Sequence, residues 1–171
     1  ILGNDVGQIA GEKAGIIKSG TPVITAVTHR EALPVIRTTS ANKKAKLYRV
    51  DETFTYVHDD SKENGTYFSY RSPFSERRNL FISMKGYHQV QNAALALMAV
   101  DSLKQYYALV IEEIEIREGL KKANWPGRFE EISRSPHIIL DGAHNPEGVQ
   151  SLVDTLEEYY PNKRVHVLFA A

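Results

Sequence analysis

Apolar and polar residues alternate along the chain in a pattern that is typical of a mixed α/β protein. From Val6 to Ile17 apolar residues recur at helical spacing, with Asp5 as a candidate N-cap and Gly20 as a candidate helix end. The continuous apolar run 22–27 then predicts a buried strand. A helix that leads into a buried strand indicates an α/β sheet.

The remaining elements follow from the same signals of period and turn residues. Between 53 and 70 the apolar period changes to two around a polar segment, 59–65, which predicts a β-hairpin with a loop of several residues. The other predicted elements are, in order, a helix over 30–42 interrupted near Pro34, strands over 47–50 and 79–84, a helix after Gly86, a short amphipathic helix over 112–122, strands over 129–132 and 138–140, a helix ending at Tyr160-Pro161 and a final strand over 165–171.

A domain boundary is predicted at residues 124–128. Pro126 and Gly127 stop regular structure there, and a new succession of strands and a helix begins after them. We therefore predict two domains, 1–123 and 124–171.

The composition excludes several classes of protein. Lys plus Arg and Asp plus Glu both number 21, so the charge gives no reason to expect binding to nucleic acid or to a membrane. The absence of cysteine excludes a disulfide scaffold and thiolate chemistry, and it fits a reducing cytoplasm. No apolar run approaches the roughly 18 residues of a membrane span. Because the chain starts with Ile1 and stops inside an apolar run, we expect a fragment of a longer protein.

The stretch PHIILDGAHNP at 136–146 carries the densest candidate chemistry. It opens with an apolar run that suits a buried strand, and Asp141 follows at the carboxyl end, where open α/β sheets bind ligands. Asn145 is a good helix cap before a proline, and a helix start favours phosphate. We expect Asp141, His144 and Asn145 to face a ligand. A capped turn with an incidental histidine is an alternative that the local pattern leaves open.

Other polar residues have a functional and a structural interpretation. Gln89 and Asn92 share one helix face, and their amides suit the edge of a purine, but they also suit a bridge to neighbouring backbone. Arg128 follows a glycine and is either aimed at phosphate or on the surface. Lys13 lies on or beside an apolar stripe, where it either extends to water or acts as a positioned or modified amine near a charged ligand.

Three stretches of the sequence point to one family. They are Leu2-Gly3 with IAGEKAGIIK at 9–18, GYHQ at 86–89 with NAA at 92–94, and WPGR at 125–128 with LDGAHNP at 140–146. In these motifs, their order and their approximate spacing, the chain resembles the bacterial folylpolyglutamate synthase/dihydrofolate synthase family of the Mur-ligase superfamily. The first and third stretches are specific to this branch.

The resemblance implies an ATP-dependent ligase with an α/β fold. The chain would comprise the C-terminal part of a Mur-ligase P-loop ATPase domain and the start of a Rossmann-like C-terminal domain. Such enzymes phosphorylate the carboxylate of folate or dihydropteroate, and the amino group of L-glutamate then displaces the phosphate to form an amide. ATP and Mg²⁺ are the implied cofactors. We expect the full-length enzyme to be a cytoplasmic monomer.

The resemblance also implies roles for individual residues. Lys13 matches a lysine that is typically carbamylated and whose carbamate helps hold magnesium, so Lys13 and His144 are the predicted catalytic residues. Asn92 matches the asparagine that contacts adenine, Arg128 and His144 lie toward the phosphates, and Asp141 lies toward the nucleotide or the interdomain site. The predicted nucleotide-binding residues are Gln89, Asn92, Arg128, Asp141, His144 and Asn145.

The chain also departs from the family pattern. No run of the form Gly-x-x-Gly-Lys-Ser/Thr occurs, and a histidine that helps bind magnesium is expected shortly before Leu2. We therefore predict that the 171-residue chain alone has no ligase activity. Another Mur-type amide ligase of cell-wall precursors is an alternative, although DGAHNP and EKAGI are spelled differently in other branches. A non-catalytic nucleotide-binding remnant is a second alternative.

Overall fold

The computed structural model describes residues 5–170, which form two compact units. Unit 1 comprises the chain up to Tyr56 together with 70–76 and 94–110, and unit 2 comprises 57–69, 77–93 and the chain from Ile111 onward. This division by packing differs from the two domains expected from the sequence, and the boundary at 124–128 stays a prediction.

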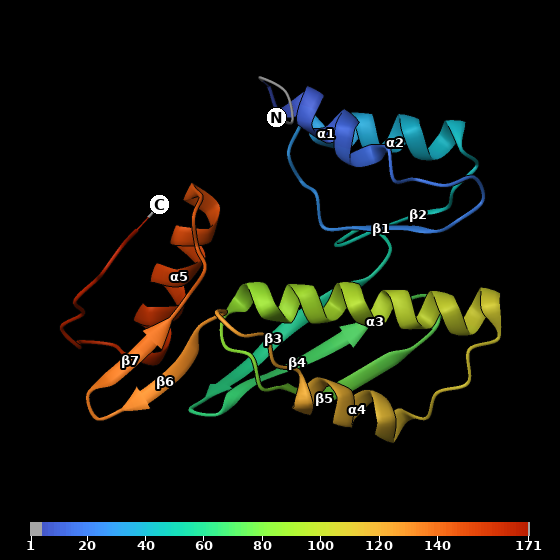
Figure 1. Cartoon of the computed structure of the whole chain (residues 1–171). Helices are drawn as coiled ribbons and strands as arrows, with labels where there is room; N and C mark the ends of the chain where they lie inside the picture. The colour runs from blue at the N-terminus through green and yellow to red at the C-terminus, as the bar shows by residue number, and fades with distance from the viewer. Residues whose placement is uncertain (1–4, 171) are drawn as a thin grey trace. The chain divides into compact units, whose positions relative to one another are not determined.

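Unit 1 begins with two helices and two strands in alternation: α1 (Val6–Ala14), β1 (Val23–Thr25), α2 (Ala32–Asn42) and β2 (Leu47–Arg49). β1 and β2 pair in parallel, as strands joined by a crossover helix do. The two helices pack together beside this strand pair (Figure 1). Ala14, Ile17 and Ala45 form a buried cluster, against which Val23 and Val35 pack. The predicted α/β character is confirmed.

Two expected features of these helices are wrong. The Asp5 side chain accepts a hydrogen bond from the Gln8 amide at 2.8 Å, as expected for a cap, but α1 ends at Ala14 rather than near Gly20. Gly20 has a φ of +71° and serves the turn before β1 instead. α2 is not interrupted at Pro34, because this proline lies in the first turn, where its missing N–H is not needed.

A three-stranded sheet has the order β3 (Thr55–Lys62), β4 (Gly65–Arg71) and β5 (Glu76–Ile82). The predicted hairpin is confirmed, but its loop is only residues 63–64, so the long polar loop over 59–65 is wrong. Polar residues can continue β3 because this edge strand leaves alternate side chains exposed.

Helix α3 (Tyr87–Tyr107) begins after Gly86 as predicted, and Val90, Ala94 and Met98 on one face are fully buried. Helix α4 (Glu113–Lys122) begins with a capping box between Glu112 and Glu115. None of the helices described within residues 5–170 combines the length and the apolar character that a membrane crossing requires.

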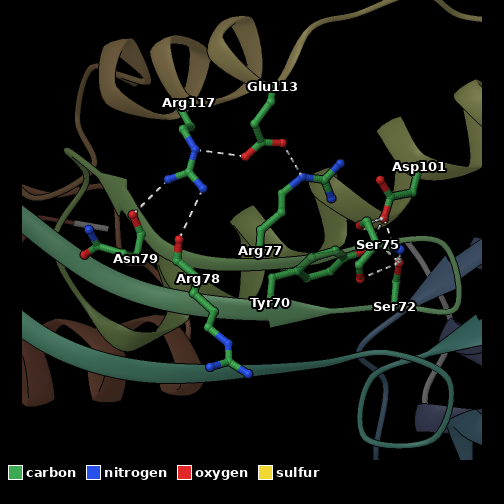
Figure 2. A network of polar contacts seen from close by, with 9 residues as sticks. All are labelled: Tyr70, Ser72, Ser75, Arg77, Arg78, Asn79, Asp101, Glu113 and Arg117. Carbon is green, nitrogen blue, oxygen red and sulfur yellow. Dashed lines mark hydrogen bonds and ion pairs between the residues drawn. The ribbon is translucent and has the colours of Figure 1, made fainter.

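Hydrogen bonds and ion pairs of charged side chains connect α4 to β5 in unit 2 (Figure 2). The Arg77 Nε donates to Glu113 at 2.9 Å, and the Arg117 Nε donates to the other oxygen of the same carboxylate at 2.9 Å. Arg117 also donates to the carbonyl oxygens of Arg78 and Asn79. Because Arg77 is buried and its partner is half exposed, this cluster positions α4 more than it stabilises the fold.

A second network lies in unit 1 and surrounds a buried carboxylate. The hydroxyls of Tyr70, Ser72 and Ser75 all donate to Asp101, at 3.1, 2.7 and 2.6 Å (Figure 2). Asp101 is 3% exposed, so these donors replace water around its charge and fix the turn between β4 and β5.

Unit 2 ends with β6 (Glu130–Arg134), β7 (His137–Leu140) and α5 (Pro146–Tyr159). β6 and β7 are antiparallel, and α5 lies beside them (Figure 1). The Tyr160 ring stacks on the Phe129 ring. The expectation that β7 is buried is wrong, since Leu140 is half exposed in a sheet whose two described strands pair only with each other. The predicted final strand is also wrong for the described residues, because 163–170 are exposed and form no strand.

Candidate functional site

A cavity of about 180 Å³ in unit 2 is the candidate functional site. Four segments line it: the first turns of α3, the turn before β6, the loop between β7 and α5, and the first turns of α5. The lining residues are His88, Gln89, Asn92, Arg128, Phe129, Asp141, Gly142, Ala143, His144, Asn145, Gly148, Ser151 and Leu152. All six residues predicted to bind nucleotide therefore lie around one cavity, although 52 positions of sequence separate Gln89 from Asp141.

Asp141 builds the loop at this cavity by accepting two backbone hydrogen bonds. Its Oδ2 accepts from the amide of Phe129 at 2.8 Å, and its Oδ1 accepts from the amide of Ala143 at 2.8 Å. The amide of Gly142 donates in turn to the carbonyl of Gly127 at 2.8 Å. The carboxylate thus joins two segments of the cavity wall, and both of its oxygens are engaged in that task.

Arg128 lies across Gly142 and is available to a ligand. Its side chain makes no hydrogen bond or ion pair with any other residue in the described range 5–170. A ligand that buried this charge would therefore have to supply its partner. A Cβ atom on Gly142 would come within 2.6 Å of the Arg128 Nη1. The glycine therefore leaves the space that the guanidinium occupies.

Replacing Gly142 with alanine should displace Arg128 without unfolding the chain. The φ angle of Gly142 lies outside the left-handed region, the closest atom is the end of a flexible side chain, and the Gly127 carbonyl oxygen would lie 3.3 Å from the Cβ atom. We expect ADP to bind about tenfold more weakly, the loss of one charge-assisted hydrogen bond, with the free energy of unfolding changed by less than about 1 kcal/mol. Calorimetric titration measures the ADP affinity, and urea denaturation measures the free energy of unfolding. If the free energies of binding and of unfolding fell by the same amount, the contact between Gly142 and Arg128 would be contradicted.

The start of α5 forms one part of the cavity wall. Asn145 caps the helix as predicted, and its Oδ1 accepts from the Gly148 amide at 2.8 Å. The His144 Nδ1 donates to the carbonyl of Gly142 at 2.8 Å, so the Nε2 atom is the one left for a ligand. A helix N-terminus beside a guanidinium favours an anion.

Amide groups in the first turns of α3 form another part of the cavity wall. The Asn92 Nδ2 donates to the Gln89 Oε1 at 3.2 Å, and the Gln89 Nε2 lies 3.0 Å from the His88 Nε2. Gln89 is 5% exposed, whereas Asn92 is exposed and reachable.

His88 was missed in the sequence, although it belongs to the GYHQ motif. Burial lowers the pKa of His88 below its usual value, the nearby Asp141 carboxylate partly opposes this shift, and the Arg128 guanidinium adds to it. The ring is therefore neutral at pH 7. Ser151 was missed as well. The helical spacing of residues alone does not show which polar face of a helix lines a cavity and which faces solvent.

Lys13 does not line this cavity. It is exposed on α1 in unit 1, and Leu2-Gly3 of the same motif lie outside the described residues. Across residues 5–170 there is no group of three or more His, Asp or Glu side chains placed to hold a metal ion. These residues therefore do not by themselves fit a magnesium site, and the carbamate role of Lys13 stays a prediction.

Several known proteins are similar to this chain. The model of the family "Mur ligase, glutamate ligase domain" matches residues 127–171. The dihydrofolate synthase/folylpolyglutamate synthase of Bacillus subtilis is 40% identical over 171 residues, which are 100% of this chain and 40% of the relative. The folylpolyglutamate synthase of Lacticaseibacillus casei is 31% identical over 160 residues, 94% of this chain and 37% of the relative.

Solved structures show the same fold. An FPGS–AMPPCP–folate complex is 31% identical, with a TM-score of 0.90 over 95% of this chain and 40% of that chain. A folylpolyglutamate synthase from Thermotoga maritima is 37% identical, with a TM-score of 0.82 over 93% of this chain and 37% of that chain. The first of these structures holds AMPPCP, an ATP analogue, together with folate.

The α/β fold and the family match place the chain among the Mur ligases. Its relatives narrow this class further. The chain belongs to the folylpolyglutamate synthase/dihydrofolate synthase family, whose members are ligases. It spans 40% of the length of the Bacillus subtilis relative.

Proposed function

We propose that this chain supplies one wall of the nucleotide site of an ATP-dependent ligase that joins L-glutamate to folate or dihydropteroate. The observation that carries this proposal is the cavity in unit 2, which is lined by all six of the residues that the sequence motifs predict for nucleotide binding. The relatives support the choice of reaction, since they are named dihydrofolate synthase and folylpolyglutamate synthase.

Two groups of lining residues suit the two ends of ATP. The exposed Asn92 amide offers both a donor and an acceptor to a purine edge. Arg128 and the N-terminus of α5 offer positive charge to phosphate oxygens. The Asp141 carboxylate holds the segments that carry these groups, so its role is to position the wall.

The proposed reaction has two steps, a phosphoryl transfer and an amide formation. A substrate carboxylate oxygen attacks the terminal phosphorus of ATP, and the bond from that phosphorus to ADP breaks. The amino group of L-glutamate then attacks the acyl carbon, releasing phosphate and a proton and forming the amide. Arg128 and the α5 N-terminus would stabilise the negative charge on the nucleotide during the first step.

Titration of the purified 171-residue chain with ADP tests the nucleotide site. We expect measurable binding that Asn92→Ala weakens about tenfold, because a purine hydrogen bond is lost. Gln105→Ala is the matched control, since Gln105 is an exposed amide further along α3. Equal effects of both substitutions, or no binding of ADP, would overturn the proposed site.

An amide-forming assay with ATP, L-glutamate and dihydropteroate or folate tests the reaction. We expect no product from the 171-residue chain, because it has no Gly-x-x-Gly-Lys-Ser/Thr run, and product from the polypeptide expressed from its gene. Product from the chain alone would show that the phosphate-binding loop is dispensable. No product from the gene's polypeptide would argue for a binding protein.

A further inference from the structure

The side chains of His88, Gln89 and Asn92 form a chain of hydrogen bonds with a defined direction. An amide nitrogen only donates, so the Gln89 Nε2 donates to the His88 Nε2 at 3.0 Å, and this ring nitrogen must be unprotonated. The Gln89 Oε1 accepts from the Asn92 Nδ2 at 3.2 Å. The Asn92 Oδ1 then remains as an acceptor for a ligand in the cavity, beside the second N–H of Nδ2.

The opposite direction would present different chemistry to the ligand. If the His88 Nε2 carried a proton, it would donate to the Gln89 Oε1, and the Gln89 Nε2 would donate to the Asn92 Oδ1. The Asn92 Nδ2 would then face the cavity with its donors. A purine with a 6-amino group needs an acceptor here, and a purine with a 6-oxo group needs a donor.

The backbone at Gly86 and two charged side chains surround His88. The ring lies so close to Gly86 that a Cβ atom there would approach the ring Nδ1 to 2.9 Å, and Gly86 has a φ of +101°. The charged groups that face the ring are Asp141, on the loop after β7, and Arg128, on the turn before β6. His144 lines the same cavity.

We propose that His88 is a positioning residue that sets the hydrogen-bond direction of Gln89 and Asn92, and that the cavity thereby selects a 6-amino purine over a 6-oxo purine. This inference rests on the proposed nucleotide site and assigns its specificity. His88 acts through the two amides and need not touch the nucleotide.

The ligand-free chain provides the first test. Long-range ¹⁵N–¹H correlation spectra report which ring nitrogen carries the proton. At pH 7.5 we expect His88 to be neutral, with the proton on Nδ1, and we expect the Gln89 side-chain amide signals to move in His88→Ala but not in His166→Ala. His166 is an exposed histidine outside the cavity. A proton on Nε2 at this pH would overturn the proposal.

The second test compares ADP with inosine diphosphate, which differs from ADP in carrying a 6-oxo group. The wild-type chain should prefer ADP about tenfold, the effect of one hydrogen bond. His88→Ala should reduce that preference, and His88→Gln, which keeps an acceptor, should restore part of it. The affinity for phosphate alone should stay the same in both variants, unlike in a variant whose cavity has collapsed.

The pH dependence separates this role from simple packing. Below the lowered pKa of His88 the ring becomes a donor at Nε2, so the preference for ADP should hold at pH 7.5 and fall once the pH drops below that pKa. His88→Ala should lose this dependence. Equal preference for both nucleotides in the wild type would overturn the specificity role alone. Binding of neither would overturn the proposed nucleotide site and the specificity with it.

Discussion

Replacing Gly65 with alanine should lower the free energy of unfolding by about 3 kcal/mol or more, from the sum of backbone strain and overpacking. Gly65 begins β4 with a φ of +147°, a conformation that other residues rarely adopt. A Cβ atom would lie 2.2 Å from the carbonyl oxygen of Ile82 and 2.7 Å from the Phe81 ring. Because a backbone atom of β5 is the obstacle, the strands themselves would have to separate.

Urea denaturation followed by circular dichroism measures this loss, and Gly119→Ala is the matched control. Gly119 lies in α4, where a Cβ atom would meet nothing within 4 Å, so alanine should leave stability unchanged or raise it by about 0.5–1 kcal/mol through helix propensity. If Gly65→Ala cost no more than Gly119→Ala, the close approach of β4 and β5 at this residue would be wrong.

The cavity is the part of the molecule that the sequence predicted best. The cap at Asn145, the helix after it and the position of Asp141 at the end of a strand all follow from local turn chemistry. That Asn92 and Arg128 line the same cavity did not follow from local patterns, since α3 and the turn before β6 are far apart in sequence. It was expected only because the motifs resemble a known family.

The predictions that failed depend on burial, which a local pattern does not fix. The apolar run before Asp141 forms β7 but stays largely exposed, because in the described chain it pairs with β6 alone. Residues 59–62 are polar and nevertheless continue β3, because an edge strand can expose them. The role of His88 depends on the direction of two side-chain amides, which no spacing of residues encodes.

Replacing Arg128 with alanine should weaken ADP binding about 10- to 100-fold, the range expected when hydrogen bonds to a charged group are lost. No other residue of the described chain, 5–170, holds the Arg128 side chain by a hydrogen bond or ion pair, so its removal leaves no buried partner behind. Stability should change by less than about 0.5 kcal/mol, as for other surface substitutions. Adenosine, which has no phosphate, should bind the variant and the wild type equally.

Conservative and remote substitutions decide what Arg128 contributes. Arg128→Lys keeps the charge but not the planar fork, so ADP affinity should lie between the wild type and Arg128→Ala. Arg30→Ala removes an exposed arginine of unit 1 and should leave binding unchanged. The affinities can be measured by the fluorescence of Trp125, the single tryptophan, which lies three residues before Arg128 in the sequence. An equal loss of adenosine and ADP affinity in Arg128→Ala would mean that this residue shapes the cavity wall, and the phosphate end of the site would then have to lie elsewhere.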